Sequence, residues 1–405
     1  MAPARKSLLD RAPIVDRLGN GLQKAWDRGW LPPIVLEPDV LIEKAIGNKL
    51  IETEGDGRKA EDNADFRERL AKICSAIDEE AQLNPIGRSF AYGQLTRAIR
   101  QRHELGKLWR GRPDILETEL APPIIVVGQM RAGTTRVHRL LSADPKHAAT
   151  RFCDSWHPVP QSLDLRPFWS GMALFWARRL NPWIDTIHPF GAARPDEELG
   201  WLASALDHSA YEAQWNIPSY VAFSETRDPA PVYREFARIL RTDALHHGNA
   251  HRPRVMKVPQ FAEDLDSLLD QFPDARVVIA ERDLQATIKS SISLVANQMA
   301  MQSDHIDLEQ LHSEWKRKIA LRSEQMTAAL SKFTGPVAQV NFGQLEEDWE
   351  AAIGELYQAL RLTLSDDALA AMRAEQRQAA KSDHRKHAED LDRIAPTGPK
   401  SQFGG

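Results

Sequence analysis

Two glycines in one short loop are the clearest chemical signal in the sequence. Gly128 and Gly133 lie five positions apart, between an apolar run and a segment that begins with Thr134 and Thr135. This spacing is typical of a loop that wraps backbone N–H groups around an anion, with the dipole of the following helix adding attraction. Glycine is needed where the chain takes a positive φ close to a ligand, and threonine hydroxyls can donate to that ligand or cap the helix. The pattern therefore predicts a phosphate-binding loop.

The loop carries its positive charge in its interior. Loops of nucleoside triphosphatases have Lys directly after the second glycine, followed by a Ser or Thr that holds Mg²⁺. Here Thr134 stands at the Lys position, and the cation of the loop is Arg131. This arrangement suits a 5′-phosphosulfate better than a metal-bridged triphosphate, so we expect no metal requirement. A nucleotide kinase or triphosphatase stays open as the alternative, as does a glycine-rich turn without a ligand.

Short, largely apolar runs predict the strands that position this loop. They occupy residues 124–127, 254–258, 277–280 and 337–340, and the first and third are followed by helical patterns. Strands that alternate with helices indicate an α/β fold with a parallel sheet, whose ligands bind beyond the carboxyl ends of the strands. The phosphate loop follows the first of these runs.

Helical patterns flank the predicted sheet on both sides. Apolar residues recur at three- and four-residue steps over residues 65–81, and a second helix is expected after Asn84 and Pro85, with His103 in a structural role. We therefore expect a helical segment over residues 1–118, an α/β nucleotide-binding core over 119–345 and a helical segment over 346–405.

Composition excludes several classes of protein. The chain has 405 residues, is 42% hydrophobic and carries a formal charge of −5, which argues against a disordered chain and against a nucleic-acid-binding surface. The two cysteines cannot form a disulfide framework, and no Cys or His cluster has zinc spacing. No apolar stretch is long enough to span a membrane, and the first residues do not read as a secretory signal. We expect a cytoplasmic protein.

The loop resembles the donor loop of the sulfotransferases that use 3′-phosphoadenosine 5′-phosphosulfate (PAPS), and most closely that of their bacterial branch. Residues 129–135 keep the family's Arg, Gly and both Thr residues and depart from it at Met130 and Ala132. The resemblance covers roughly residues 60–395, including the segment 83–88. It implies a P-loop-like fold with PAPS as co-substrate. It also implies a set of residues that hold the 5′-phosphosulfate: Arg131, Ala132, Gly133, Thr134 and Thr135.

Three further positions match the family in order along the chain. Arg282 and Ser290 resemble the pair that binds the 3′-phosphate, which suits a guanidinium fork and a hydroxyl donor. Lys257 resembles the lysine at the strand end beside the transferring sulfuryl group, although Val258 replaces the usual serine. The basic run 381–387, with Arg385, resembles the segment that closes over the nucleotide; an exposed helix end is the alternative.

The general base is the least defined part of the predicted site. Cytosolic relatives have a His two residues after the strand-end lysine, where this chain has Pro259. By the resemblance to the bacterial branch, Asp154 is the leading candidate. The alternatives are His157, His188 and the pair Glu197 and Glu198. Arg131 and Lys257 are expected to stabilise the charge that moves onto the leaving phosphate.

Aromatic residues gather after the donor loop. The chain has 11 tryptophans, and residues 156–190 hold seven Trp and Phe residues. Helical core packing is the expectation for most of them. The alternatives are an apolar acceptor pocket, or weak association of residues 168–180 with a membrane surface.

The predicted activity is the transfer of a sulfuryl group from PAPS to a hydroxyl or amine of a small, moderately apolar acceptor such as a lipid, glycoside or metabolite. A non-catalytic nucleotide-binding scaffold stays open as an alternative, because Ala132, Val258 and Pro259 depart from the family pattern.

Overall fold

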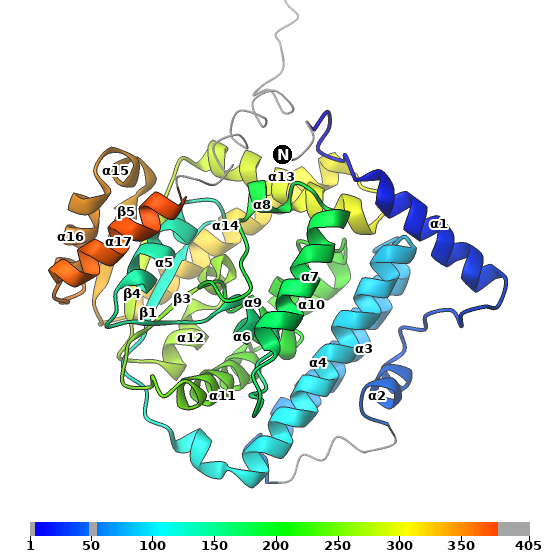
Figure 1. Ribbon diagram of the computed structural model, residues 1–405, viewed down its shortest axis with the longest axis horizontal. Coiled ribbons are helices and arrows are strands. Elements are labelled where there is room, and N and C mark those ends of the chain that lie inside the picture. Colours follow the sequence, from blue (N-terminus) through cyan, green and yellow to red (C-terminus); the bar gives the residue numbers. More distant parts are fainter. Residues whose placement is uncertain (1–4, 48–54, 380–405) are drawn as a thin grey trace, which may run out of the picture.

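The described residues form a five-stranded sheet whose strands all run parallel; it lies on the left of the view in Figure 1. The computed structural model describes residues 5–47 and 55–379, so Arg385 and the rest of the basic run lie outside the described residues. The strand order is β2-β3-β1-β4-β5. The strands are β1 (Ile124–Gly128), β2 (Ala148–Ala149), β3 (Arg254–Lys257), β4 (Arg276–Glu281) and β5 (Val337–Asn341). The predicted α/β fold with a parallel sheet is confirmed, and the two-residue strand β2 was not predicted.

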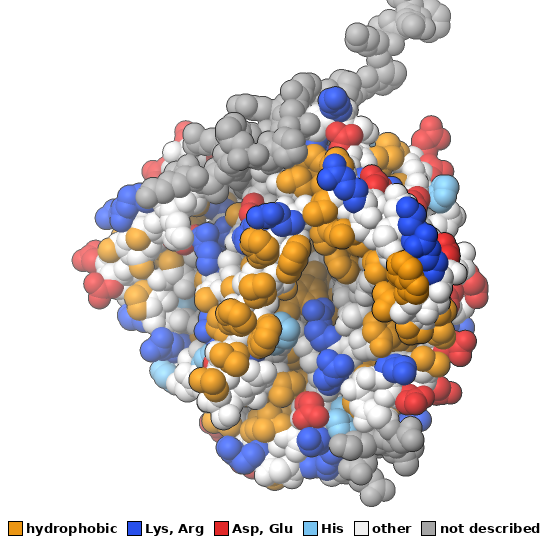
Figure 2. Space-filling view, turned by 45° about the vertical axis from the view of Figure 1, so that its right-hand side comes forward, with side chains coloured by type: hydrophobic (Ala, Val, Ile, Leu, Met, Phe, Trp, Pro, Cys, Tyr) orange, Lys and Arg blue, Asp and Glu red, His pale blue; other side chains and the backbone are white. Residues whose placement is uncertain are grey.

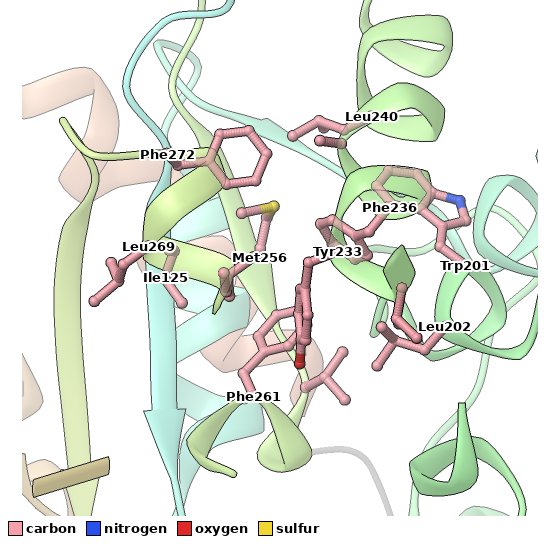
Figure 3. Close-up of a cluster of buried hydrophobic side chains, with 14 of the residues drawn as sticks. Ile125, Trp201, Leu202, Tyr233, Phe236, Leu240, Met256, Phe261, Leu269 and Phe272 are labelled. Atoms are coloured by element: carbon pink, nitrogen blue, oxygen red, sulfur yellow. The ribbon is translucent and has the colours of Figure 1, made fainter. Parts of the chain in front are cut away.

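The inner strands β3, β1 and β4 are buried on both faces, which explains why they read as apolar runs, whereas the edge strand β5 exposes alternate residues. Ile125 and Val127 of β1 face a core shared with α11 (Ala230–His246) and α12 (Leu265–Gln271), shown in Figure 3. Ile124 and Val126 face the opposite core, which α5 (Thr134–Ala143) and α16 (Trp349–Ala359) complete. Alternate residues of one strand therefore fix helices on both faces.

Helices precede the sheet in the chain, as predicted. They are α1 (Pro13–Asp27), α2 (Pro38–Ile46), α3 (Ala60–Glu79) and α4 (Pro85–Gly111). The last begins at Pro85, because the side chain of Asn84 accepts a hydrogen bond from the Gly87 N–H at 2.9 Å. Helix α4 packs against α13 (Leu284–Gln302), the helix that follows β4. The N-terminal helices thus reach the carboxyl-end side of the sheet.

About one hundred residues separate β2 from β3 and fold into short helices. Besides α11, these are α6 (Phe152–Trp156), α7 (Arg166–Leu180), α8 (Ile184–Ile187), α9 (Leu199–Ser204) and α10 (Pro218–Glu225). The helices after α13 are α14 (Leu308–Lys332), α15 (Phe342–Glu347), α16 and α17 (Asp366–Ala379). Short 3₁₀ turns occur at Pro113–Glu117, His208–Ala210 and Pro259–Ala262. Among the described residues, none of the helices combines the length and the apolar character needed to cross a bilayer.

Helix α7 corrects the expectation of core packing for the aromatic cluster. Phe168, Trp169, Phe175 and Trp176 are between 44% and 57% exposed. The helix buries the opposite side, through small and aliphatic residues such as Leu174. Figure 2 shows apolar side chains gathered in patches on this side of the molecule. Only one face of α7 meets the protein, so the aromatic residues on its other face remain exposed. We call these residues, together with Met172, the α7 aromatic face.

A buried ionic cluster joins α6 to α7 and α11. Asp154 forms ion pairs with Arg151 at 2.6 Å and with Arg166 at 3.2 Å, and His247 lies 3.4 Å from the same carboxylate and 3.5 Å from Asp243. Contacts with the two carboxylates raise the pKa of His247 to about 9. Burial opposes the ionisation of Asp154, but the contacts with His247 and Arg151 still lower its pKa. The cluster therefore favours a charged imidazolium on a charged carboxylate.

We predict that His247→Gln destabilises the protein below neutral pH and has a smaller effect in alkaline solution. The raised pKa of His247 contributes stability that is fully present below its ordinary value of 6.5 and is lost as the pH rises through about 9. We expect the variant to lose about 1–2 kcal/mol of unfolding free energy at pH 6. Denaturant unfolding between pH 6 and 9 measures it. If the difference in unfolding free energy between variant and wild type stays constant over this pH range, the raised pKa of His247 is contradicted.

Candidate active site

A cavity of about 1230 Å³ opens at the carboxyl-end edge of the sheet. Most residues predicted to bind the donor line it, together with several candidates for the general base. The donor residues are Arg131, Gly133, Thr134, Thr135, Arg282 and Ser290, and the base candidates are His157, His188 and Glu197. Lys257 also lines the cavity. Ala132 is buried beside it, while Asp154 and Glu198 are not among the lining residues.

The phosphate loop needs both of its glycines. Gly128 has a φ of +138°, and a Cβ there would lie 2.3 Å from the carbonyl oxygen of Ala280 in β4. Gly133 has a φ of +90°, and a Cβ there would lie 2.7 Å from the ring of Phe342. Gly133 is also the N-cap of α5, so the first N–H groups of that helix face the loop. The backbone thus forms a tight glycine turn at the start of α5, as the spacing predicted, and binding of an anion there stays a prediction.

The structure brings together Arg131, Arg282 and Ser290 from separate elements. Arg131 Nε donates a hydrogen bond to Ser290 Oγ at 2.9 Å, and Arg282 donates to the Arg131 carbonyl oxygen at 3.1 Å. The Arg282 guanidinium also lies 4.5 Å from the centre of the Phe342 ring. Burial and then the nearby charge of Arg282 lower the pKa of Arg131 to about 10. Two guanidinium groups held this close repel each other, and a bound anion would relieve that repulsion.

Lys257, at the end of β3, joins the phosphate loop to an acidic group. Its side chain is 1% exposed. Its ammonium donates a hydrogen bond to Thr135 Oγ1 at 3.0 Å and forms an ion pair with Glu197. The Lys257 N–H donates to Glu198 Oε2 at 2.9 Å, which fixes the strand end. Burial raises the pKa of Glu198 to about 8. One cation is therefore shared between the loop and a carboxylate in the same cavity.

An imidazole and a second carboxylate lie beside Glu197. His188 Nε2 lies 3.0 Å from Asp196 Oδ1. Burial opposes the ionisation of Asp196, but the contact with His188 still lowers its pKa. One ligand atom from each of His188, Asp196 and Glu197 lies within 4.8 Å of the others. A metal ion can also use this spacing, so the metal-free site stays a prediction.

The contacts of Asp154 do not favour it as the general base. Its carboxylate is buried in the ionic cluster of α6, α7 and α11, where two arginines and His247 surround it. The lowered pKa also makes this carboxylate a weak proton acceptor. The structure instead favours Glu197 as the general base, which was one of several alternatives from the sequence.

Asp196 and Arg97 are among the lining residues that the sequence analysis did not predict. Asp196, which contacts His188, directly precedes Glu197 and Glu198. The run of three acidic residues could have indicated Asp196 as a site residue. Arg97 of α4 also lines the cavity. Its only sequence signal is the lack of an acid three or four positions away on the same helix.

Comparisons with known proteins identify the family and the fold of the chain. A family model described as the sulfotransferase family matches residues 122–366. Among solved structures, sulfotransferase STF1 from Mycobacterium tuberculosis H37Rv superposes with a TM-score of 0.71 at 24% identity, covering 89% of this chain and 98% of that one. Sulfotransferase STF9 from Mycobacterium avium superposes with a TM-score of 0.73 at 19% identity, covering 90% and 96%. At these identities the likeness establishes a shared fold.

No curated protein matches the chain by sequence. The family match begins just before β1, includes Arg131, Lys257 and Arg282, and ends at the start of α17. It covers more than half of the 405 residues. The chain therefore belongs to the sulfotransferase family.

Proposed function

We propose that the protein transfers a sulfuryl group from PAPS to a hydroxyl or amine of a small, moderately apolar acceptor. The observation that carries this proposal is the position of Lys257, whose ammonium touches Thr135 of the phosphate loop and Glu197 in the same cavity. A sulfuryl group in transit needs a cation on one side and a proton acceptor on the other. Lys257 is the cation and Glu197 the proton acceptor, and the two side chains are in contact.

The donor residues fit the anionic groups of PAPS. The glycine turn and the start of α5 offer N–H groups to the 5′-phosphosulfate, with Thr134 and Thr135 at the helix start. Arg282 and Ser290 are assigned to the 3′-phosphate, as the family resemblance implied. Arg131 lies between the two sets, because it is part of the loop and bonds to Ser290. PAPS supplies an activated sulfuryl group with a phosphate as its leaving group.

The rest of the cavity suits an apolar acceptor. Trp156, Leu174, Ala177 and Phe190 line it, so α7 contributes its small and aliphatic side to the wall. These residues lie on α6, on α7 and after α8, away from the phosphate loop in sequence. The apolar wall favours an acceptor with a hydrocarbon or aromatic body.

In the proposed step, Glu197 accepts the proton of the acceptor hydroxyl or amine. The acceptor atom forms a bond to sulfur while the bond from sulfur to the 5′-phosphate oxygen breaks, and the electron pair stays on that phosphate. Lys257 and Arg131 stabilise the negative charge that develops there. The products are the sulfated acceptor and 3′-phosphoadenosine 5′-phosphate (PAP).

We predict that Arg282→Ala weakens PAP binding about 10- to 100-fold, because one charge-assisted contact to the 3′-phosphate is lost. Affinity for adenosine 5′-phosphate, which lacks that group, should change little. Isothermal titration calorimetry measures both. Arg373→Ala, on the exposed face of α17 in a pair with Glu350, is the matched control. An equal loss of affinity for both nucleotides would overturn the assignment of Arg282.

We predict that Glu197→Gln lowers the turnover number about 10²- to 10⁴-fold and leaves the PAP dissociation constant close to that of the wild type. The assay follows transfer of labelled sulfuryl to a panel of apolar phenols, alcohols and amines that includes 2-naphthol. Glu375→Gln is the control, since this cavity carboxylate pairs with Arg194 rather than with Lys257. If His188→Gln abolishes turnover while Glu197→Gln does not, His188 is the base.

We also propose that the α7 aromatic face rests on a membrane surface that presents the acceptor. Helix α7 has no acidic residue, and its Arg179 lies 4.8 Å from the centre of the Phe175 ring in the α7 aromatic face. Arg166 and Arg178 of the same helix are already paired with acids. Tryptophan is a residue that favours the lipid–water interface. The same helix forms a wall of the cavity. Helix α7 therefore has the α7 aromatic face on one side and the acceptor space on the other.

We predict that the protein floats with vesicles containing phosphatidylglycerol and that the double change Trp169→Ala, Trp176→Ala reduces the bound fraction several-fold. Both side chains are more than half exposed, so the fold should tolerate the change. Trp30→Ala, at a tryptophan that is 69% exposed after α1, is the matched control. Equal binding by all three proteins would contradict the proposal.

A further inference from the structure

A guanidinium group in the cavity wall has no anionic partner among the described residues. Arg97 lies on α4 and lines the cavity. Its guanidinium lies 5.0 Å from the centre of the Trp156 ring. Within residues 5–47 and 55–379, no carboxylate forms an ion pair with it. A cation stacked on an aromatic ring is held in place with its N–H donors still available.

The neighbours of Arg97 on α4 cannot neutralise it. The residues three and four positions away are Gly93, Gln94, Arg100 and Gln101, and none is acidic. The two glutamine amides already have partners, because Gln94 donates to Gln214 at 2.9 Å and Gln101 donates to the Trp156 carbonyl oxygen at 2.7 Å. Burial lowers the pKa of Arg97, which shows that its surroundings disfavour the charge. An anion that enters the cavity would offset this cost.

Arg97 lies apart from the donor residues. It belongs to a group of lining residues on α4, on α6 and just after the His208–Ala210 turn, and this group includes Trp156, His157 and Gln214. None of these residues is in the phosphate loop or in the segment between β4 and α13, which hold Arg131 and Arg282. Burial lowers the pKa of His157 to about 4, so this imidazole is neutral at physiological pH. Arg97 is thus the positive charge of this group.

We propose that Arg97 binds an anionic group of the acceptor, a carboxylate, a phosphate or a sulfate. The acceptor is then an apolar molecule with a hydroxyl or amine near Lys257 and an anion against Arg97 and Trp156. The planar guanidinium can donate two parallel hydrogen bonds to such an oxyanion. This inference deepens the proposed function, because it names the acceptor class for the same cavity.

The test compares three ligands that differ in one terminal group. Hydroxydodecanoate, its primary amide and the corresponding amino alcohol have the same chain, and they end in an anionic, a neutral and a cationic group. Calorimetry on the protein loaded with PAP should give about 10- to 100-fold tighter binding for the carboxylate than for the amide. The amino alcohol should bind most weakly.

Two variants and one control separate a specific contact from a change in folding. Arg97→Gln should remove the preference for the carboxylate, and Arg97→Glu should shift the preference towards the amino alcohol. Arg100→Gln is the matched control, since Arg100 lies on the same helix but is exposed and outside the cavity. This variant should keep the wild-type order of affinities.

Three outcomes overturn the inference: equal affinity of the wild type for the three ligands, absence of carboxylate binding, and an unchanged preference in Arg97→Gln. These results are distinct from a failure of the proposed function. That failure appears as a lack of PAP binding in the same titrations, and the three ligands can then be compared on the protein without PAP.

Discussion

The site depends on one buried ammonium group. Lys257 ends a short strand whose every residue is buried, and its charge requires anionic or polar partners on all sides. Thr135 supplies one partner from the phosphate loop, and Glu197 supplies another from the chain that precedes α9. The parallel sheet explains the contact with Thr135, because β1 and β3 are neighbours and both end at the same edge. The phosphate loop and the acid that faces the acceptor space are thereby fixed relative to each other.

The sheet and the donor side could be predicted from the sequence because both leave local signals. Strands buried on two faces read as apolar runs, and a loop with a positive φ at Gly128 and Gly133 demands glycine. The contact of Arg131 with Ser290 was not predicted, but the order of the strands explains it. The first follows β1 and the second lies on the helix after β4, and these two strands pair in register.

The acceptor side could not be predicted in the same way, since about one hundred residues of short helices lie between β2 and β3. Which acid faces the cavity depends on how these helices pack. Asp154 satisfies a sequence pattern but is turned into an ionic cluster, whereas Glu197 reaches Lys257. The exposure of the aromatic residues of α7 could not be predicted either. Apolar residues occur on several sides of this helix, and only packing decides which side is buried. Arg97 carries no local motif at all.

The measurement that tests the central claim most directly is the thermal stabilisation of the protein by two nucleotides, PAP without metal and ATP with Mg²⁺. A site built on Arg131, Arg282 and Ser290, with Thr134 where a triphosphatase has its lysine, should bind the 3′-phosphate of PAP and gain little from a metal-bridged triphosphate. We predict a clear rise in melting temperature with PAP and a much smaller one with ATP and Mg²⁺. A larger rise with ATP and Mg²⁺, or none with PAP, would contradict the account.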